Sequence, residues 1–434
     1  MLDSVAAAPL SPILAIERAV QDRAKTNALD VTGPDGHTQL RTLIDEEILR
    51  WQNDFKRGLR PYQLGDSETL GQRVFTNIAG YGPLTSLLDD NDVWEIMINA
   101  PSEIFIKRHS GPNGYHEESF EDDEHVIRTL TRILDDSNTS HRKLDPTEGL
   151  QDAQLDNGAR LHIVHGDLSR GGHIMVNIRK FTGVAITSLE QLTDRDMMSP
   201  PVAQFLAACV TAKTSIIFAG APGSGKTTLL SCCAAELDPT LRVVIAEEVF
   251  EADVPVANVA SMQTRAARAD RPAIDLRRLV SGFLRMAPDI AIVGEVRDRE
   301  ALPLLLTLSS GVKGFTTIHA GSARRALTRL RFICQLADTS SELPIAALNT
   351  LVSEAIDLVV HCERGPDGPR ITAIIAVEDL QGGADATQFT VTDLFERRTP
   401  REPLQWTGAL PSRLTTEFEK AGLDIRSLLD SGTP

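Results

Sequence analysis

The spacing of apolar positions changes near residue 200, and this change is the first guide to the architecture. Beyond that point, short apolar runs alternate with longer segments of helical character. Such runs are typical of strands that are covered on both faces, as in parallel sheets. This half of the chain therefore predicts alternating strands and helices around a largely buried parallel sheet. The runs are Ser215–Ala219, Val243–Ala246, Ile290–Val293 and Phe315–Ile318.

The chain before residue 200 carries shorter and more mixed signals. Apolar residues at helical spacing among charges predict an amphipathic helix over Leu40–Phe55. Further along, brief apolar runs next to turn residues predict an α+β domain with short strands. Strands are expected at Trp94–Ile98, Glu103–Ile106 and Gly172–Phe181, and a hairpin turn at 156–158 joins strands at Gln154-Leu155 and Arg160–His162.

Turn and proline signals between these patterns divide the chain into five parts. We expect residues 1–40, rich in Ala, Pro, Gly and Thr, to be loosely ordered, and a helical region to follow at 41–64. A smaller α+β domain then covers 65–190, and the domain with the buried parallel sheet covers 191–398. Residues 399–434, with Pro, Arg, Glu and short helical pieces, are expected to form a C-terminal tail.

Length and charge narrow the class of protein. The chain has 434 residues, which favours two or three domains. Its formal net charge of -16 argues against a protein that grips DNA or an anionic membrane by bulk charge. The longest charge-free run, Met197–Ala212, is too short and too polar to cross a bilayer, so no transmembrane segment is expected. The start, Met-Leu-Asp, lacks a basic region, so no signal peptide is expected.

Cysteine usage favours a reducing compartment, and hence a cytoplasmic protein. The chain has five cysteines, an odd number, and none forms a C-x-x-C pair. Neither a disulfide framework nor a zinc site is therefore expected. The cysteines are Cys209, Cys232, Cys233, Cys334 and Cys362.

A phosphate-binding motif follows the first apolar run. Residues 220–227 match the pattern G-x-x-x-x-G-K-[ST], with a strand before and a helix-forming segment after. Backbone N–H groups must wrap a phosphate, Lys226 can reach the β- and γ-phosphates, and the Thr227 hydroxyl can ligate Mg²⁺. A chance glycine-rich turn is disfavoured by the strand and helix around it. The residues expected to bind ATP are Gly220, Ala221, Pro222, Gly223, Ser224, Gly225, Lys226, Thr227 and Thr228.

Acidic residues end two of the other predicted strands. Ile290–Val293 leads to Gly294 and Glu295, where Glu295 could polarise water for attack on the γ-phosphate. The alternative is an ordinary strand end capped by a solvated acid. Glu247 and Glu248 follow another strand, and one of them could share the metal or the water. A solvated acidic edge explains Glu248 equally well.

His319 follows the strand Phe315–Ile318. A single histidine after a strand is more often a structural hydrogen bonder than a catalyst. Its place at the carboxyl end of a core strand raises the case for function, because ligands collect there in open α/β sheets.

Together these motifs resemble one family, the ATPases of type II and type IV secretion systems, and within it the CpaF type of Tad/Flp pili. Two further segments in the N-terminal half resemble motifs of the same family. The matching segments are 95–101 and 178–181 in that half, 220–228 as Walker A, 246–251 as the acidic box, 284–297 as the Walker B region and 316–322 as the histidine box.

The sequence departs from the family pattern at three points. Glu248 stands where the family usually has Asp, and Gly321 stands where Asn is common. The tetracysteine zinc module of many type II and pilus extension ATPases has no counterpart here. This last difference favours the CpaF type.

The resemblance implies a homo-hexamer that hydrolyses ATP with Mg²⁺ and powers pilus assembly or protein secretion. It implies a C-terminal RecA-like P-loop domain behind a smaller PAS-like α+β domain, with ATP held between them. Catalytic roles are implied for Glu295, Glu247 and His319, with Glu247 also at the metal. Arg160 and Arg179 fit the positions of arginines that sense the γ-phosphate, although strand-edge arginines without that role explain both equally well.

The implied partners are inner-membrane platform proteins of a pilus or secretion machine, which would hold this protein at the inner face of the cytoplasmic membrane. A nucleic-acid-translocating P-loop ATPase is the main alternative. The acidic charge and the lack of an aromatic and basic groove disfavour it, so no direct nucleic-acid contact is expected. A kinase is a third possibility, which phosphate release without a phosphorylated product would exclude.

Overall fold

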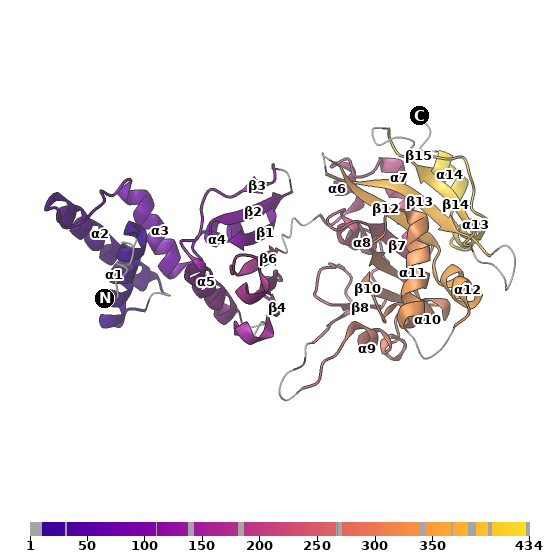
Figure 1. Ribbon diagram of the computed structural model, residues 1–434. Helices are drawn as coiled ribbons and strands as arrows, with labels where there is room; N and C mark the ends of the chain where they lie inside the picture. The colour runs from indigo at the N-terminus through magenta and orange to yellow at the C-terminus, as the bar shows by residue number, and fades with distance from the viewer. Residues whose placement is uncertain are drawn as a thin grey trace. The chain divides into compact units, whose positions relative to one another are not determined.

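The computed structural model divides the chain into two compact units, residues 1–184 and 185–434. Figure 1 shows their helices and strands in chain order. Each unit has its own hydrophobic core, and each is described by itself below. The structure describes residues 11–30, 33–109, 111–137, 143–180, 186–265, 267, 271–337, 343–365, 368–380, 388–397 and 402–430.

Three helices open the first unit: α1 (Pro12–Thr26), α2 (Pro34–Lys56) and α3 (Ser67–Ala79). They pack on one another through a small apolar core that includes residues of α1 spaced by helical turns. The expectation that residues 1–40 are loosely ordered is therefore wrong for the described part, residues 11–30 and 33–40. Composition hid the helical spacing of the buried apolar residues of α1, which are Ile13, Ile16, Val20 and Ala24.

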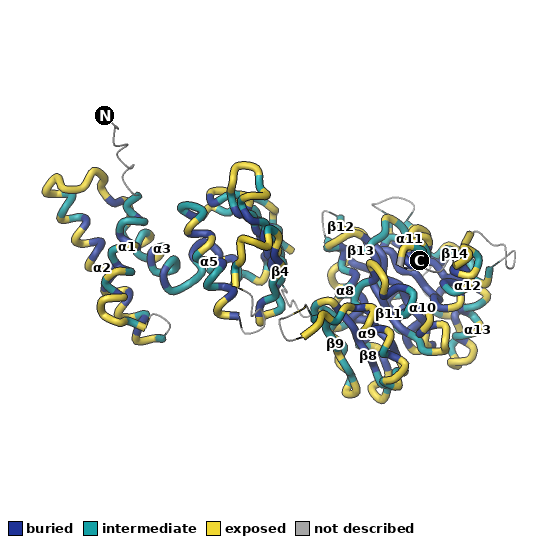
Figure 2. The backbone as a smooth tube through the Cα atoms, turned by 60° about the horizontal axis from the view of Figure 1, so that its bottom comes forward, coloured by how far each residue is buried: buried dark blue, intermediate teal, exposed yellow. Residues whose placement is uncertain are grey.

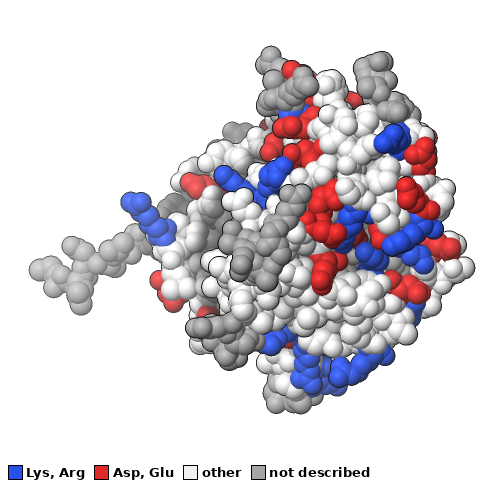
Figure 3. Space-filling view, turned by 90° about the vertical axis from the view of Figure 1, so that its right-hand side faces the viewer, with Lys and Arg blue, Asp and Glu red and all other residues white. Residues whose placement is uncertain are grey.

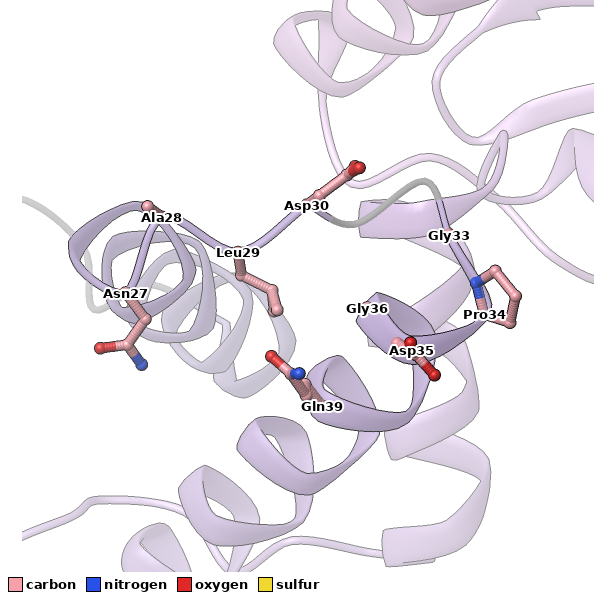
Figure 4. Close-up of a pocket in the computed structure, with 9 residues that line it drawn as sticks. All are labelled: Asn27, Ala28, Leu29, Asp30, Gly33, Pro34, Asp35, Gly36 and Gln39. Atoms are coloured by element: carbon pink, nitrogen blue, oxygen red, sulfur yellow. The ribbon is translucent and has the colours of Figure 1, made fainter.

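A hollow of about 410 Å³ lies between the end of α1 and the start of α2 (Figure 4). It is an open surface feature next to a helix turn, and its described lining is mainly amide, carboxylate and backbone groups. It lies in a different unit from the phosphate-binding motif. Its lining residues are Asn27, Ala28, Leu29, Asp30, Gly33, Pro34, Asp35, Gly36 and Gln39.

An antiparallel sheet forms the rest of the first unit, with strand order β3-β2-β1-β6-β5-β4 among the described residues. The helix α5 (Asp123–Asp136) buries one face in a core shared with the strands, and the short α4 (Leu84–Asp89) joins that core. The α+β character thus matches the interpretation of this segment. The strands are β1 (Val93–Ala100), β2 (Glu103–Arg108), β3 (Gly114–Tyr115), β4 (Leu150–Gln154), β5 (Arg160–Val164) and β6 (Met175–Arg179). Phe181, expected in β6, lies outside the described residues.

The second unit is built on a mixed sheet with the order β15-β14-β13-β12-β7-β11-β10-β8-β9 among the described residues. The strands from β12 to β9 in this order run parallel, and β13, β14 and β15 extend the sheet in antiparallel fashion. The sequence predicted the parallel centre and missed the antiparallel extension. The strands are β7 (Ile216–Gly220), β8 (Val243–Glu247), β9 (Val259–Gln263), β10 (Ile290–Val296), β11 (Lys313–Ile318), β12 (Leu358–Gly365), β13 (Gly368–Val377), β14 (Val391–Glu396) and β15 (Gln405–Trp406).

Helices cover both faces of this sheet. In β7, Ile216 and Phe218 belong to one core, and Ile217 and Ala219 belong to the other, as the alternation of a strand requires. Figure 2 shows the buried strands as the dark centre of this unit, with the exposed positions around them. The first face carries α6 (Leu189–Thr193), α7 (Pro200–Thr211) and α8 (Lys226–Ala234), and the second carries α9 (Leu276–Val280), α10 (Ala301–Ser309), α11 (Ala323–Ala337) and α12 (Ile345–Ala355).

The C-terminal segment is part of this second unit, which corrects the expectation of a tail over 399–434. Residues 402–430 add β15, α13 (Ser412–Lys420) and α14 (Ile425–Asp430) to the unit. Phe418 and Leu429 are fully buried in the core beneath α7. The helical pieces were visible in the sequence, but their spacing did not show what they pack against.

Charged side chains of both signs lie on the surface of the molecule (Figure 3). On the face of the molecule in Figure 3, acidic and basic side chains lie close together over one part of the surface, and a group of basic side chains lies along the lower edge. Among the helices that the structure describes, none is both long enough and apolar enough to cross a bilayer.

Candidate functional site

The predicted phosphate-binding motif forms a tight connection between β7 and α8. β7 ends at Gly220 and α8 begins at Lys226, so the motif lies at the carboxyl end of the parallel strands. Gly225 caps α8 with a φ of 86°, which favours glycine. A Cβ on Gly220 would lie 2.2 Å from the carbonyl oxygen of Cys362, so no side chain fits there. A tightly turned backbone before a helix N-terminus is an arrangement that binds phosphate.

Lys226 lies inside this loop, with 7% of its surface exposed. Its ammonium group donates to the Ala221 carbonyl at 2.9 Å and lies 3.3 Å from Nδ1 of His319. The Ser224 hydroxyl donates to the same carbonyl at 2.8 Å, which closes the loop on itself. The loop therefore holds a cation where a bound nucleotide would present its β- and γ-phosphates.

Polar side chains meet at the ends of β10 and β11. Glu295, close to the end of β10, accepts a hydrogen bond from Arg297 at 2.5 Å and lies 2.7 Å from Nε2 of His319. Arg297 also donates to Glu248 at 3.1 Å. Because His319 contacts Lys226 with its other ring nitrogen, one continuous chain of contacts joins the cation of the loop to the predicted base.

The hydrogen bonds to Glu295 decide its charge. Burial alone raises the pKa of this carboxyl, but the hydrogen bonds and charges of His319 and Arg297 outweigh burial and lower the pKa to about 2. Glu295 is therefore ionised at neutral pH. A carboxylate held this way is a weak proton acceptor, so it gains basicity only when His319 or Arg297 releases it.

Two groups of the phosphate loop lie within hydrogen-bond distance of the same ring nitrogen of His319. Its Nδ1 lies 3.3 Å from the Lys226 ammonium, which only donates, and 3.2 Å from the Gly220 carbonyl, which only accepts. In the neutral ring that donates to Glu295 from Nε2, Nδ1 accepts from Lys226. With a hydrogen on Nδ1, the ring would instead donate to Gly220. The two partners compete for the same atom, so His319 can hold only one of them at a time.

Gly294 explains how the acidic box reaches the strand that carries Glu295. A Cβ at position 294 would lie 2.8 Å from Cγ of Glu247 and 2.9 Å from its Oε1. Glu247 is 2% exposed, and its Oε1 accepts from the backbone N–H groups of Glu251 and Ala252 at 3.1 and 3.0 Å. The carboxylate of Glu247 thus occupies the space that a side chain at position 294 would need.

Glu247 and Glu248 therefore differ, although the sequence left the choice between them open. Glu248 is about half exposed, with a side-chain exposure of 51%, and forms an ion pair with Arg297. Glu247 lies inside, against Gly294. The glycine at this strand position, which replaces the acid of many P-loop proteins, leaves room for the acid supplied by β8.

Thr227 and Glu247 are the residues expected at the metal. Thr227, half-buried, is the second residue of α8, and Thr228 follows it in the first turn. Among the described residues, no group of three or more His, Cys, Asp or Glu side chains forms a closed metal cage. A Mg²⁺ ion bound here would take ligands from Thr227 and from the phosphates of the nucleotide, as Mg²⁺ usually does.

Arg160 and Arg179 lie in the first unit, opposite each other on the neighbouring strands β5 and β6. The antiparallel register of β5 and β6 pairs them directly. Like charges in directly opposite positions destabilise a sheet unless an anion lies between or near them. The guanidinium of Arg179 forms no hydrogen bond or ion pair with any other residue that the structure describes. Arg160 and Arg179 are thus direct cross-strand neighbours within the first unit.

Sequence reasoning missed several residues that contact this site. Arg297 was part of the Walker B resemblance, but only the structure shows that it holds Glu295. Arg364 lies close to the end of β12, the neighbour of β7 on the side opposite β11, and donates to the Gly223 carbonyl at 3.2 Å. The signal for Arg297 was its place two residues after Glu295, and no sequence signal pointed to Arg364.

Comparison with known proteins agrees with these motifs. Residues 77–388 match the family described as Type II/IV secretion system protein. The probable conjugal transfer protein TrbB of Sinorhizobium fredii (strain NBRC 101917 / NGR234) is 30% identical over 314 residues, which are 68% of this chain and 86% of TrbB. The type IV secretion system protein PtlH of Bordetella pertussis (strain Tohama I / ATCC BAA-589 / NCTC 13251) is 30% identical over 300 residues, 64% of this chain and 87% of PtlH.

Among solved structures, the VirB11 ATPase from the Brucella suis type IV secretion system in complex with sulphate aligns with 24% identity and a TM-score of 0.35. The alignment covers 67% of this chain and 94% of that structure. The family match spans most of the chain and includes the phosphate loop, Glu247, Glu295 and His319. The chain belongs to the Type II/IV secretion system protein family.

Proposed function

We propose that this protein is an ATP hydrolase whose reaction drives mechanical work in a pilus or secretion machine. The observation that carries the proposal is the chain of contacts from Lys226 through His319 to Glu295, at the carboxyl ends of three neighbouring parallel strands. Ligands collect at this edge of open α/β sheets. The family membership supports the same conclusion, since the family includes secretion ATPases.

The chain's own residues have separate parts in the proposed reaction. Lys226 neutralises charge on the β- and γ-phosphates, and Thr227 and Glu247 would hold Mg²⁺. The ion would supply further charge stabilisation at the phosphates. Glu295 orients the attacking water and accepts its proton, once His319 turns toward the nucleotide and no longer donates to it. A single movement of His319 would thus make a contact with the nucleotide and release Glu295 to act as the base.

The paired arginines of the first unit are proposed to sense the γ-phosphate. ATP and ADP differ only in that group, so a motor must contact it from a part that moves. Arginine suits this role, with a permanent charge and a planar fork that matches phosphate oxygens. Arg160 and Arg179, on the neighbouring strands β5 and β6, would contact the γ-phosphate.

For the whole machine, we propose a homo-hexamer of the CpaF type, with a RecA-like second unit, that powers assembly of Tad/Flp pili or protein secretion. Its partners would be platform proteins of the inner membrane, which would hold it at the cytoplasmic face. The relatives TrbB and PtlH, named for conjugal transfer and type IV secretion, support work in an envelope-spanning system. The missing zinc-module cysteines support the CpaF type.

Steady-state phosphate release by the purified full-length chain tests the enzyme assignment. We expect ATP-dependent release that needs Mg²⁺ and leaves no phosphorylated product. Single-stranded DNA should not stimulate it, whereas strong stimulation would favour the nucleic-acid motor instead. A chain that binds ATP and releases no phosphate under any of these conditions would contradict the proposal.

Replacing the arginines tests the sensor part. Arg179→Ala should lower turnover by about tenfold or more even at saturating ATP, because the contact matters most as charge develops on the γ-phosphate. Arg160→Ala should have a similar or milder effect. Arg170→Ala, an exposed arginine of the same unit, is the matched control and should leave turnover unchanged. Wild-type turnover in folded Arg179→Ala would show that Arg179 has no part in hydrolysis.

A further inference from the structure

His361 is a buried histidine outside the motifs that define the site. It lies in β12 with 4% of its surface exposed, opposite Ala219 of β7. Its Nε2 lies 3.2 Å from the carbonyl oxygen of Ala320, the residue after His319. In the strand order, β7 lies between β12 and β11. The ring therefore reaches past the end of β7 to the segment that carries His319.

A β-bulge holds the other side of this ring. The register of β12 and β13 pairs His361 with Ala373 and Cys362 with Ile371, so Thr372 is the extra residue on β13. Its hydroxyl oxygen lies 2.7 Å from Nδ1 of His361. Bulges re-aim side chains and often lie next to active sites. The irregularity thus places a hydroxyl where a regular ladder would place none.

The two contacts fix the protonation of the ring. The Ala320 carbonyl can only accept, so Nε2 carries a hydrogen and donates to it. Nδ1 is then the nearer acceptor for the Thr372 hydroxyl, at 2.7 Å, whereas the His361 carbonyl lies 3.3 Å from the same hydroxyl. Burial lowers the pKa of His361, against the opposing effects of the Ala320 carbonyl and of Glu363, whose Oε1 lies 3.9 Å from Nδ1. The ring is neutral at pH 7, with one donor and one acceptor, both in use.

The same strand also supports the phosphate loop. The Cys362 carbonyl fills the space beside Gly220, and Arg364 donates to the Gly223 carbonyl. Consecutive parts of β12 therefore touch the beginning of the loop, its middle and the segment after His319. A shift in one of these contacts would move the loop and His319 relative to each other.

We infer that His361 is a positioning residue, which through its hydrogen bond to the Ala320 carbonyl fixes the place of His319 between Lys226 and Glu295. The inference rests on the proposed function, because it assigns His361 a part in ATP hydrolysis. The contacts of His361 are with Ala320 and Thr372. The effect is on geometry, where a displacement of about 1 Å is enough to cost about 10²-fold in rate.

Two substitutions at this position separate positioning from packing. His361→Leu fills the space but donates nothing to Ala320, and His361→Gln retains an amide N–H at a similar reach. We expect His361→Leu to lower kcat by about tenfold to 10²-fold, with KM for ATP and the affinity for ADP within about threefold of wild type. His361→Gln should recover kcat to within about threefold of wild type.

A histidine that only fills the core predicts a different result. Both variants would then lose thermal stability, and turnover per folded molecule would stay at the wild-type level in each. That result overturns the inference, as does His361→Gln with turnover as low as His361→Leu. If His361→Leu does not fold, Thr372→Val decides, because it removes the donor to Nδ1 and keeps the volume. We expect a loss of about threefold in kcat, and unchanged kcat would overturn the inference.

Failure of the proposed function would look different from failure of this inference. If the wild-type chain released no phosphate, the ATPase assignment would fall. Wild-type hydrolysis that depends on Lys226, together with unchanged kcat in His361→Leu, would overturn the inference about His361 alone.

Discussion

The two ends of the parallel strands around β7 and β11 carry two clusters of charged residues that are built in opposite ways. At the amino ends, Asp357 accepts from Lys313 at 2.7 Å, from the Ser215 backbone N–H at 2.7 Å and from Arg413 at 2.5 Å. Asp357 is 3% exposed, and each of its oxygens has a partner. This cluster is complete within the protein.

At the carboxyl ends, the partners are shared rather than complete. Nδ1 of His319 faces both the Lys226 ammonium and the Gly220 carbonyl, and can serve only one at a time. Glu295 lies partly open to solvent and is held by groups that also have other contacts. The difference indicates which cluster is structural. A cluster in which every polar group has a partner stabilises the fold, whereas a cluster with competing partners can change its contacts when a ligand binds.

Lys226→Ala should have the largest effect on turnover, because it removes the cation fixed at the β- and γ-phosphates. We expect phosphate release to fall to background while thermal unfolding stays near wild type, since the site is not a completed structural cluster. Lys420→Ala, at an exposed pair with Glu417, serves as the control and should change neither. Near-wild-type turnover in folded Lys226→Ala would mean that the loop does not bind nucleotide.

Glu295→Gln should be next, with turnover lower by about 10²-fold or more and ATP binding retained. The amide keeps the size and some hydrogen bonding but cannot accept a proton from water. Glu248→Gln is the matched control, because Glu248 also contacts Arg297 but does not contact His319. A parallel loss of binding and turnover in Glu295→Gln would assign it to structure instead.

Gly294→Ala should lower turnover by about tenfold, since the added Cβ would lie 2.8 Å from Cγ of Glu247 and push that carboxylate away. Gly321→Ala is the control, because its Cβ meets nothing closer than Arg325 at 3.7 Å. A second change, Glu247→Asp, shortens the side chain and should restore part of the turnover of Gly294→Ala. Equal activity of Gly294→Ala and wild type would show that the position of Glu247 does not matter.

Arg413→Met should leave turnover per folded molecule unchanged and instead lower the free energy of unfolding by about 3 kcal/mol. It breaks a buried ion pair and leaves Asp357 with less compensation. Arg324→Met is the control, because its pair with Asp393 is exposed and should contribute about 0–1 kcal/mol. Chemical denaturation of the two variants measures the difference. A loss of turnover without a loss of stability would break the comparison between the two clusters.

Sequence patterns were sufficient where a local rule decides the structure. The glycines of the phosphate loop, the apolar run of β7 and the hairpin turn between β4 and β5 each follow from nearby residues, and each lies where it was expected. Short-range spacing also identified Lys226, Glu295 and His319 as candidates. Their roles stay predictions, but the structure brings the three side chains into one chain of contacts.

Sequence patterns failed where partners are distant along the chain. Nothing near Arg413 indicates that its partner is Asp357, and nothing near His361 indicates Ala320. The helices α13 and α14 looked like a tail because their buried residues pack on α7, more than a hundred positions earlier by residue number. Gly294 was correctly noted as unusual, but its reason, the carboxylate of Glu247 from another strand, is visible only in three dimensions.

The completed cluster at Asp357 also bears on how the second unit folds during synthesis. β7 is made early, yet its neighbours β11 and β12 come much later, and the contact from Ser215 to Asp357 spans 142 positions. Arg413 emerges from the ribosome a further 56 residues on. Until β11 and β12 have been made, β7 lacks its neighbouring strands, and until Arg413 has been made, Asp357 lacks one of its partners. Long-range pairing of this kind slows folding and exposes chains to aggregation. Chaperone dependence of the nascent chain should therefore end only after Arg413 has been made.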